Sequence, residues 1–314
     1  MKATLRRGLV IFAGLALGFG VWWSWEQNQP VRFLAAGDIL PDRGVRAAIE
    51  QYGADGLFEG VTGTFRSGDL VLANLEAPLT NRSIPLAKRI AFRGDSSFAP
   101  ALRRSGIDMV SLANNHTLDC GREGLEETIE AIQDAGIRFV GAGRNEREAH
   151  RMRVVTRHGL RIALLGYSTF PLEGLVYQPD RPTVSLGRDP GRVAREVRQA
   201  RRKADLVIVM YHWGDEFTPK PTRLQRQLAR NAIDAGADLV LGSHPHVLQP
   251  METYRGRPIV YSLGNFVFDH KGEAQRTSTI FSCELTRAGA GKIRMIPVRI
   301  QDCRPQLAKE HPRR

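Results

Sequence analysis

Apolar residues in this chain fall into short continuous runs separated by longer amphipathic stretches. Runs of about four to eight apolar residues are typical of strands that are buried on both faces. We therefore predict strands at 31–36, 69–73, 107–110, 205–210 and 237–241. Apolar residues at helical spacing predict helices at 45–52, 98–105, 121–135 and 223–235. On the last helix, Leu224, Leu228 and Ile233 are expected to face the core. This alternation predicts an α/β domain.

Other segments indicate that the sheets are mixed. The pair 153–156 and 160–167 flanks His158-Gly159, which is typical of a hairpin turn. Alternating segments at 279–286 and 292–300 predict exposed edge strands that complete the fold. Parallel and antiparallel pairs are therefore expected together.

Polar side chains follow five of the predicted strands. They are Asp38, Glu76, Asn115 with His116, His212, and His244 with His246. Ligands of open α/β sheets bind beyond the carboxyl ends of the strands, so these groups are expected to converge. Each has an ordinary alternative explanation: Asn114 and Asn115 can build a turn, and a lone histidine can be structural. The joint pattern favours a ligand site.

The residue types at these strand ends indicate a divalent metal. Carboxylate, amide oxygen and neutral imidazole are ligands for Mn²⁺, Fe²⁺ or Zn²⁺. On an extended strand end, residues two apart point the same way, so His244 and His246 can reach adjacent coordination positions. Cys120, Cys283 and Cys303 are too few and too widely spread for a thiolate site. Free, buried thiols are expected, although an oxidising compartment would permit Cys283 to pair with Cys303.

The first 25 residues have the pattern of a membrane signal. Lys2, Arg6 and Arg7 precede an uncharged run from Gly8 to Trp25. That run is long for a signal-peptide core and lacks a small-x-small cleavage site, so an uncleaved single-pass anchor is expected, with a cleaved signal peptide as the alternative. The basic flank predicts that the domain lies outside the inner membrane, in the periplasm. The expected organisation is an anchor and linker at 1–30, one domain at 31–303 and a charged, disordered tail at 304–314.

Composition restricts the partners. The formal net charge of +12 and the pI near 10.2 suit phospholipid headgroups, an anionic polymer or a phosphorylated substrate. No nucleic-acid partner is expected, because the sequence has neither an aromatic-plus-basic binding signature nor a recognition-helix pattern.

Six ordered motifs resemble the CapA family of bacterial capsule and poly-γ-glutamate synthesis proteins. They are Gly37-Asp38, Asn74-Leu75-Glu76, Leu112-Ala113-Asn114-Asn115-His116, Tyr211-His212-Trp213-Gly214, Gly242-Ser243-His244-Pro245-His246 and Tyr261-Ser262-Leu263-Gly264-Asn265-Phe266. The resemblance spans residues 31–300. It implies a calcineurin-like metallophosphoesterase fold, a four-layer α-β-β-α sandwich with mixed sheets, and for several relatives a place in a membrane complex that makes or exports poly-γ-glutamate.

The wider metallophosphoesterase pattern assigns metal ligands by resemblance. Its first motif is Asp-x-His, and here Leu40 stands in place of the histidine. Glu76 replaces the bridging aspartate, and the other ligands of one metal are matched by Asn115, His212 and His244. The other metal position retains only Asp38, Glu76 and His246. One well-held ion and one weak or substrate-completed ion are therefore expected.

The same pattern suggests roles around the metals. His116 matches the imidazole that hydrogen-bonds the phosphoryl group or protonates the leaving oxygen. Asp119 and Glu216 are candidates for orienting imidazoles, although either could cap a helix. Asn265 follows a strand end beside the expected site, and Arg93 is a candidate for holding an anionic ligand.

Three functions follow. The first is membrane-anchored action in the synthesis or export of poly-γ-glutamate or a related anionic capsule polymer. The second is a stand-alone extracytoplasmic metal-dependent phosphoesterase. The third is a non-catalytic scaffold of a capsule complex, which the loss of the histidine at Leu40 favours and the retention of His116 disfavours.

Overall fold

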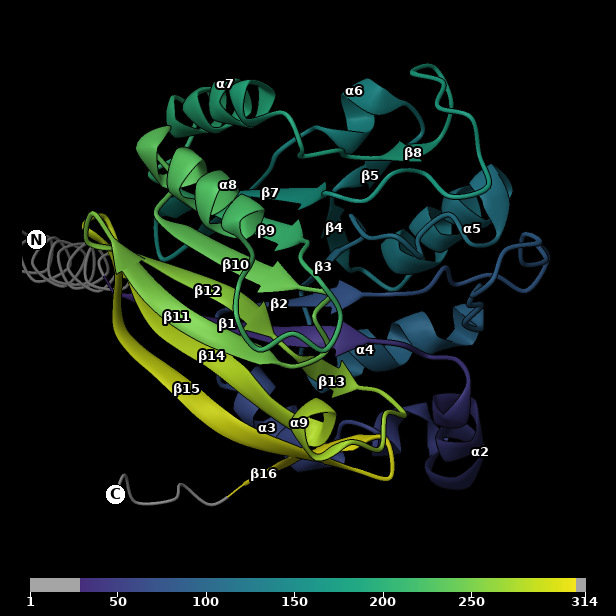
Figure 1. The fold of residues 1–314 in the computed structure, drawn as a ribbon. Coiled ribbons are helices and arrows are strands. Elements are labelled where there is room, and N and C mark those ends of the chain that lie inside the picture. Colours follow the sequence, from purple (N-terminus) through teal and green to yellow (C-terminus); the bar gives the residue numbers. More distant parts are fainter. Residues whose placement is uncertain (1–28, 309–314) are drawn as a thin grey trace, which may run out of the picture.

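The computed structural model describes residues 29–308, drawn as a coloured ribbon in Figure 1. The expected membrane anchor lies outside the described residues. Within residues 29–308, no helix is both long enough and apolar enough to cross a membrane.

The first sheet has eight strands in the order β16-β15-β14-β1-β2-β3-β4, with β13 beside β1. Its strands are β1 (Val31–Ile39), β2 (Leu70–Leu75), β3 (Met109–Ser111), β4 (Arg138–Val140), β13 (Asn265–Val267), β14 (Thr277–Thr286), β15 (Gly289–Gln301) and β16 (Arg304–Leu307). Strands β1 to β4 are parallel, and β14 to β16 add to them in antiparallel fashion.

The second sheet has six strands in the order β11-β12-β10-β9-β7-β6. They are β6 (Arg153–Arg157), β7 (Leu160–Ser168), β9 (Leu206–His212), β10 (Leu239–Ser243), β11 (Leu248–Tyr254) and β12 (Arg257–Leu263). The expected hairpin at His158-Gly159 joins β6 to β7. A small sheet pairs β5 (Ala142–Gly143) with β8 (Thr183–Val184).

Helices cover the outer face of each sheet, which gives four layers (Figure 1). The α-helices are α2 (Gly44–Gly56), α3 (Glu59–Arg66), α4 (Ala99–Ser105), α5 (Gly121–Asp134), α6 (Glu146–Ala149), α7 (Pro190–Arg201), α8 (Arg223–Asp234) and α9 (Glu273–Arg276), and a 3₁₀ turn, η1, spans Ser96–Phe98. Helices α2 to α5 pack on the first sheet, and α7 and α8 pack on the second.

Alternation along the central strands explains why one apolar core lies between the two sheets and another lies between each sheet and its helices. In β9, Leu206, Ile208 and Met210 face the first sheet, whereas Val207 and Val209 face helices α7 and α8. Successive strand residues point to opposite faces, so a strand packed on both sides must be apolar at every position. The continuous apolar runs in the sequence are therefore the central strands of a sandwich.

Three local expectations were wrong. Leu224 is 41% exposed, because the buried face of α8 is formed by residues such as Leu228 and Ala229. The segments expected as exposed edges, β14 and β15, lie inside the first sheet. The edge strand is β16, which lies in the tail that was expected to be disordered. Asp302 and Cys303, with φ of 50° and 63°, form the tight turn that folds this strand back onto β15.

Candidate metal centre

Strand register brings the polar strand ends together. Asp38 pairs with Asn74 across β1 and β2, and with Asn265 across β1 and β13. In the other sheet, Ser243 at the end of β10 pairs with His212 at the end of β9. The two sheets thus present their site residues at one end of the sandwich, as the sequence predicted.

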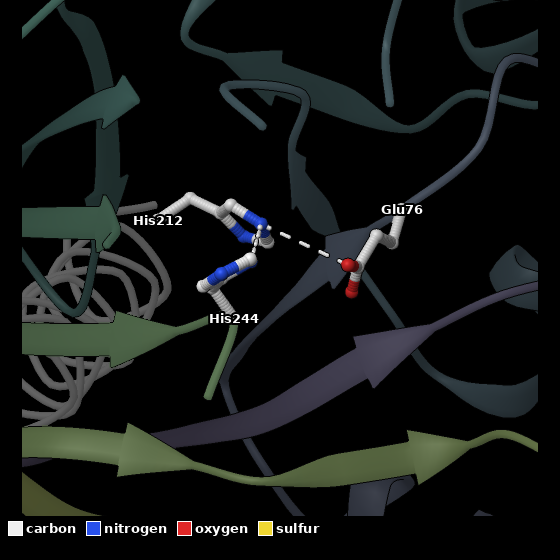
Figure 2. Close-up of side chains that lie close together, drawn as sticks. All are labelled: Glu76, His212 and His244. Atoms are coloured by element: carbon white, nitrogen blue, oxygen red, sulfur yellow. Dashed lines mark hydrogen bonds and ion pairs between the residues drawn. The ribbon is translucent and has the colours of Figure 1, made fainter. Parts of the chain in front are cut away.

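One set of donors surrounds the ring of His212. Its Nε2 lies 2.8 Å from Asn115 Oδ1, 3.1 Å from His244 Nδ1 and 3.7 Å from Glu76 Oε1. Figure 2 shows the two imidazoles and the Glu76 carboxylate facing one another. Donors that share an ion at bond lengths near 2.1 Å lie roughly 3 Å apart, so this spacing fits coordination of one cation.

An unpartnered atom tests whether a cation fits. Glu76 is fully buried, yet its Oε1 accepts no hydrogen bond within the described residues. Buried carboxylate oxygens are normally hydrogen-bonded or bound to metal, because an unpaired one is costly. His212 Nε2 and His246 Nε2 lie 3.7 and 3.6 Å from this oxygen. The donor set of carboxylate, amide oxygen and imidazole therefore fits a divalent cation.

A second set of donors lies around His246. Its Nδ1 is 2.8 Å from Asn265 Oδ1 and 3.5 Å from Asp38 Oδ2. The Asn265 amide nitrogen donates to the carbonyls of His246 and Gln275, so its oxygen must accept from His246 Nδ1. His246 Nε2 is then unprotonated and faces Glu76 Oε1. Asn265 therefore orients this imidazole. The sequence alone indicated only that Asn265 lies beside the site.

Burial sets the protonation of these groups. Enclosure raises the pKa of Asp38 to about 7, and enclosure together with the Asp38 charge raises the pKa of Glu76 well above its usual value. Burial lowers the pKa of His244 to about 3 and holds the pKa values of His212 and His246 well below the usual imidazole value. A divalent cation would favour ionised carboxylates and neutral imidazoles together.

Beside the metal centre, His116 belongs to a hydrogen-bonded chain. Its Nδ1 lies 2.8 Å from Asp119 Oδ2, and its Nε2 lies 3.0 Å from the amide nitrogen of Asn115. Lys88 Nζ lies 2.5 Å from the other Asp119 oxygen and is only 10% exposed. The expected role of Asp119 in orienting an imidazole agrees with this geometry. His116 is thereby held next to Asn115, at the edge of the donor set.

Several residues of the centre were missed from sequence. Asn74 donates to Asp38 Oδ1 at 2.8 Å, Ser243 Oγ lies 3.0 Å from His212 Nδ1, and Lys88 pairs with Asp119. Phe170, in the irregular loop after β7, packs on His244 with ring centroids 4.2 Å apart. Asn74 precedes Glu76 by two positions, so period-two facing could have indicated it. Lys88 and Phe170 lie in loops without such a signal.

The contacts within residues 29–308 do not test the predicted roles of Glu216 and Arg93. Among the described residues, Glu216 makes no hydrogen bond to an imidazole, although its carboxylate lies within 4.8 Å of ring nitrogens of His244 and His246. Arg93 hydrogen-bonds through its backbone, which accepts from Arg46 and donates to Asp42. Its role with an anionic ligand stays a prediction.

Residues 32–270 match the family model described as bacterial capsule synthesis protein PGA_cap. The chain belongs to this family. PGA biosynthesis protein CapA of Bacillus subtilis is 35% identical over 277 residues, covering 87% of this chain and 73% of that protein. Capsule biosynthesis protein CapA of Bacillus anthracis is 32% identical over 289 residues, covering 90% and 70%. The predicted kinship with CapA is confirmed.

Solved structures extend this PGA_cap assignment to the fold. A hypothetical protein from Thermus thermophilus superposes with a TM-score of 0.53 at 16% identity, covering 85% of this chain and 98% of that one. Sulfate thiohydrolase SoxB from the same organism gives 0.52 at 14% identity, covering 89% and 57%. At such identities the likeness concerns the fold alone. The predicted four-layer α-β-β-α sandwich with mixed sheets is confirmed.

Cys120, Cys283 and Cys303 are all free thiols, and the first two are buried as expected. Burial raises the pKa of Cys120 and of Cys283 to about 12, so neither supplies a thiolate ligand near neutral pH.

Proposed function

We propose that this protein acts in the synthesis or export of poly-γ-glutamate or a related anionic capsule polymer, through the divalent cation site described above. Family membership supports the pathway, because the relatives named CapA are described by PGA or capsule biosynthesis. The unpartnered Glu76 Oε1 among imidazoles is the observation that supports the cation site. The net charge of +12 suits a polycarboxylate partner.

The chemistry of the site would be divided between the cation and the protein. When bound, a divalent cation polarises an anionic ligand and neutralises charge that develops on it. Glu76, Asn115, His212 and His244 would hold the tighter ion, and Asp38, Glu76 and His246 the weaker one. His116, fixed by Asp119, would hydrogen-bond the ligand or move a proton at its Nε2.

Polymer production by the host bacterium tests this function. Deleting the gene should abolish the polymer, and wild-type protein should restore it. Glu76→Gln should fail to restore it, whereas Glu284→Gln, which removes a surface carboxylate paired with Lys292, should succeed. Unchanged polymer after deletion would refute the proposal. Full restoration by Glu76→Gln would mean that the protein acts as a scaffold and does not need the cation.

A phosphoesterase is a second candidate, favoured by the His116–Asp119 pair beside the donor set. Purified protein with Mn²⁺ should then hydrolyse a chromogenic phosphodiester, and His116→Ala should lower the rate by about 100-fold or more, the usual size of a general acid contribution. His158→Ala, in the hairpin turn of β6 and β7, is the matched control. Equal rates for wild type and His116→Ala would exclude this candidate.

We further propose that residues 1–25 attach the domain to the inner membrane and place it in the periplasm, within a capsule-synthesis complex. The basic flank and the apolar run support this topology. Membrane fractionation of cells that express full-length protein or a form lacking residues 1–25 tests it. Equal recovery of both forms in the soluble fraction would contradict the proposal.

A further inference from the structure

The second donor set is incomplete on one side. Leu40, at the position where a metallophosphoesterase has a histidine, is fully buried in an apolar cluster with Ala77, Phe92 and Phe268. The Phe268 ring of this cluster lies 4.9 Å from the His246 ring, so the apolar cluster borders the second donor set and offers it no donor. Among residues 29–308, Asp38, Glu76 and His246 form the second donor set, so a further donor would have to approach from the solvent side.

Glu216 lies on that solvent side, in the loop between β9 and α8. Its carboxylate forms, with His244 and His246, a set of donors that all lie within 4.8 Å of one another. Glu216 is exposed, and its side chain has no hydrogen bond or ion pair among residues 29–308.

The loop that carries Glu216 is fixed against the histidines. The Phe217 amide donates to the carbonyl of Pro245 at 2.8 Å, so Glu216 is held beside the residue between the two imidazoles. The Phe217 ring also lies 6.1 Å from that of His246. At the start of the loop, the Trp213 indole donates to the Tyr261 carbonyl at 2.9 Å. Glu216 is therefore placed by backbone contacts and packing.

Backbone strain is concentrated at the same contact. Phe217, His244 and His246 have φ of 59°, 95° and 57°, a region that residues with a side chain seldom occupy. Such outliers persist only where the surrounding structure imposes them, and they cluster at functional sites. Here they bring the Glu216 loop and the His244-Pro245-His246 segment face to face.

We propose that Glu216 is the solvent-side ligand of the second cation and replaces the donor absent at Leu40. This inference rests on the cation site of the proposed function. With Glu216, the second position has three carboxylates and one imidazole, a mostly oxygen set that favours Mn²⁺ over Zn²⁺. The first position has two imidazoles, one amide and one carboxylate, and is less selective between these ions.

Mn²⁺ binding by the full-length protein tests this assignment. Equilibrium dialysis with elemental analysis gives the stoichiometry, and the electron paramagnetic resonance spectrum reports whether two Mn²⁺ ions are coupled. Wild type should bind two ions, one tighter than the other, with a coupled spectrum. Glu216→Gln should weaken the second ion by about 10-fold or more, leave the first within about threefold, and give the spectrum of isolated Mn²⁺. Glu216→Asp should be intermediate.

Asp215→Asn is the matched control, because it removes the neighbouring exposed carboxylate, which belongs to none of the donor sets. It should bind two ions like the wild type, and all variants should keep the wild-type circular dichroism spectrum. Normal binding of the second ion by Glu216→Gln overturns the assignment. A wild type that binds one ion also overturns it but leaves the proposed function intact, whereas a wild type that binds none refutes the cation site itself.

Discussion

The two donor sets share Glu76 but differ in how they are built. Around His212, one nitrogen has three other donors within 3.7 Å. Around His246, the two carboxylates approach different nitrogens of the ring, Asp38 at Nδ1 and Glu76 at Nε2. Since Nδ1 donates to Asn265, only Nε2 remains for an ion. The donors of the first set can bind one cation as they are placed. In the second set, Asp38 must shift toward the Nε2 side of His246 before both carboxylates can bind the same cation.

The charges of the two sets differ as well. The set at His212 contains one carboxylate among neutral donors, whereas the set at His246 contains both Asp38 and Glu76, whose mutual repulsion raises the pKa of Glu76 beyond the effect of burial alone. A cation relieves more repulsion in the second set, but protons compete for the same carboxylates. We expect the first position to bind its cation more tightly, and the affinity of the second position to depend more strongly on pH.

Replacing Glu76, the carboxylate that the two sets share, should cause the largest loss of cation affinity. Glu76→Gln should lower the affinity of both positions by at least about 100-fold, more than is usual for a residue outside the ligand shell. The metal-free variant should be more stable than wild type by about 1–3 kcal/mol, because the amide can donate where Glu76 Oε1 has no partner. Thermal unfolding with and without Mn²⁺ measures both effects.

Opposite changes in stability and affinity would distinguish a metal ligand from a structural residue. A structural Glu76 would instead give a variant that is destabilised both with and without Mn²⁺. Retention of either ion at wild-type affinity would show that Glu76 does not join the two sets.

The outer hydrogen bonds allow each position to be weakened separately. Ser243→Ala removes the hydroxyl that lies 3.0 Å from His212 Nδ1, and Asn265→Ala removes the amide oxygen that lies 2.8 Å from His246 Nδ1. Loss of such a partner typically lowers metal affinity by about 10–100-fold. We expect Ser243→Ala to weaken the tighter ion and Asn265→Ala the weaker one, measured by titration with Mn²⁺. If both substitutions weaken binding of the same ion, the two donor sets are not separate positions.

The apolar pattern predicted the α/β class and the strand-end residues because both depend on local order, whereas the four-layer sandwich was implied by the resemblance to the CapA family. Doubly buried strands need continuous apolar runs, and the polar groups that follow them are at the same edge in any such fold. Sequence did not predict β16, because its turn contains Asp302 and Cys303 in place of the usual Asn-Gly. Only register decides that Ser243 meets His212, and only loop conformation brings Lys88 to Asp119.

Proton competition should produce a smaller difference between the two positions, which appears as a difference in how steeply their affinities fall with pH. Cation binding requires Asp38 in its ionised form, and burial raises the pKa of Asp38 from 3.8 to about 7 in the metal-free protein. Below pH 7, each proton released on binding lowers the apparent affinity about tenfold per pH unit. The second position, which uses Asp38 and Glu76, should lose affinity more steeply between pH 7 and 5.5 than the first, which uses Glu76 alone. Titration calorimetry with Mn²⁺ measures both slopes.

The pH dependence of the stability of the metal-free protein independently tests whether folding raises the pKa of Asp38. A carboxyl whose pKa is raised by folding binds its proton more tightly in the folded state. Its contribution to stability is therefore complete below pH 3.8 and is lost as the pH rises through about 7. Asp38→Asn should flatten this part of the pH–stability curve and make the weaker position no steeper than the tighter one. Equal slopes in the wild type would mean that Asp38 is not a ligand and that the two positions differ only in spacing.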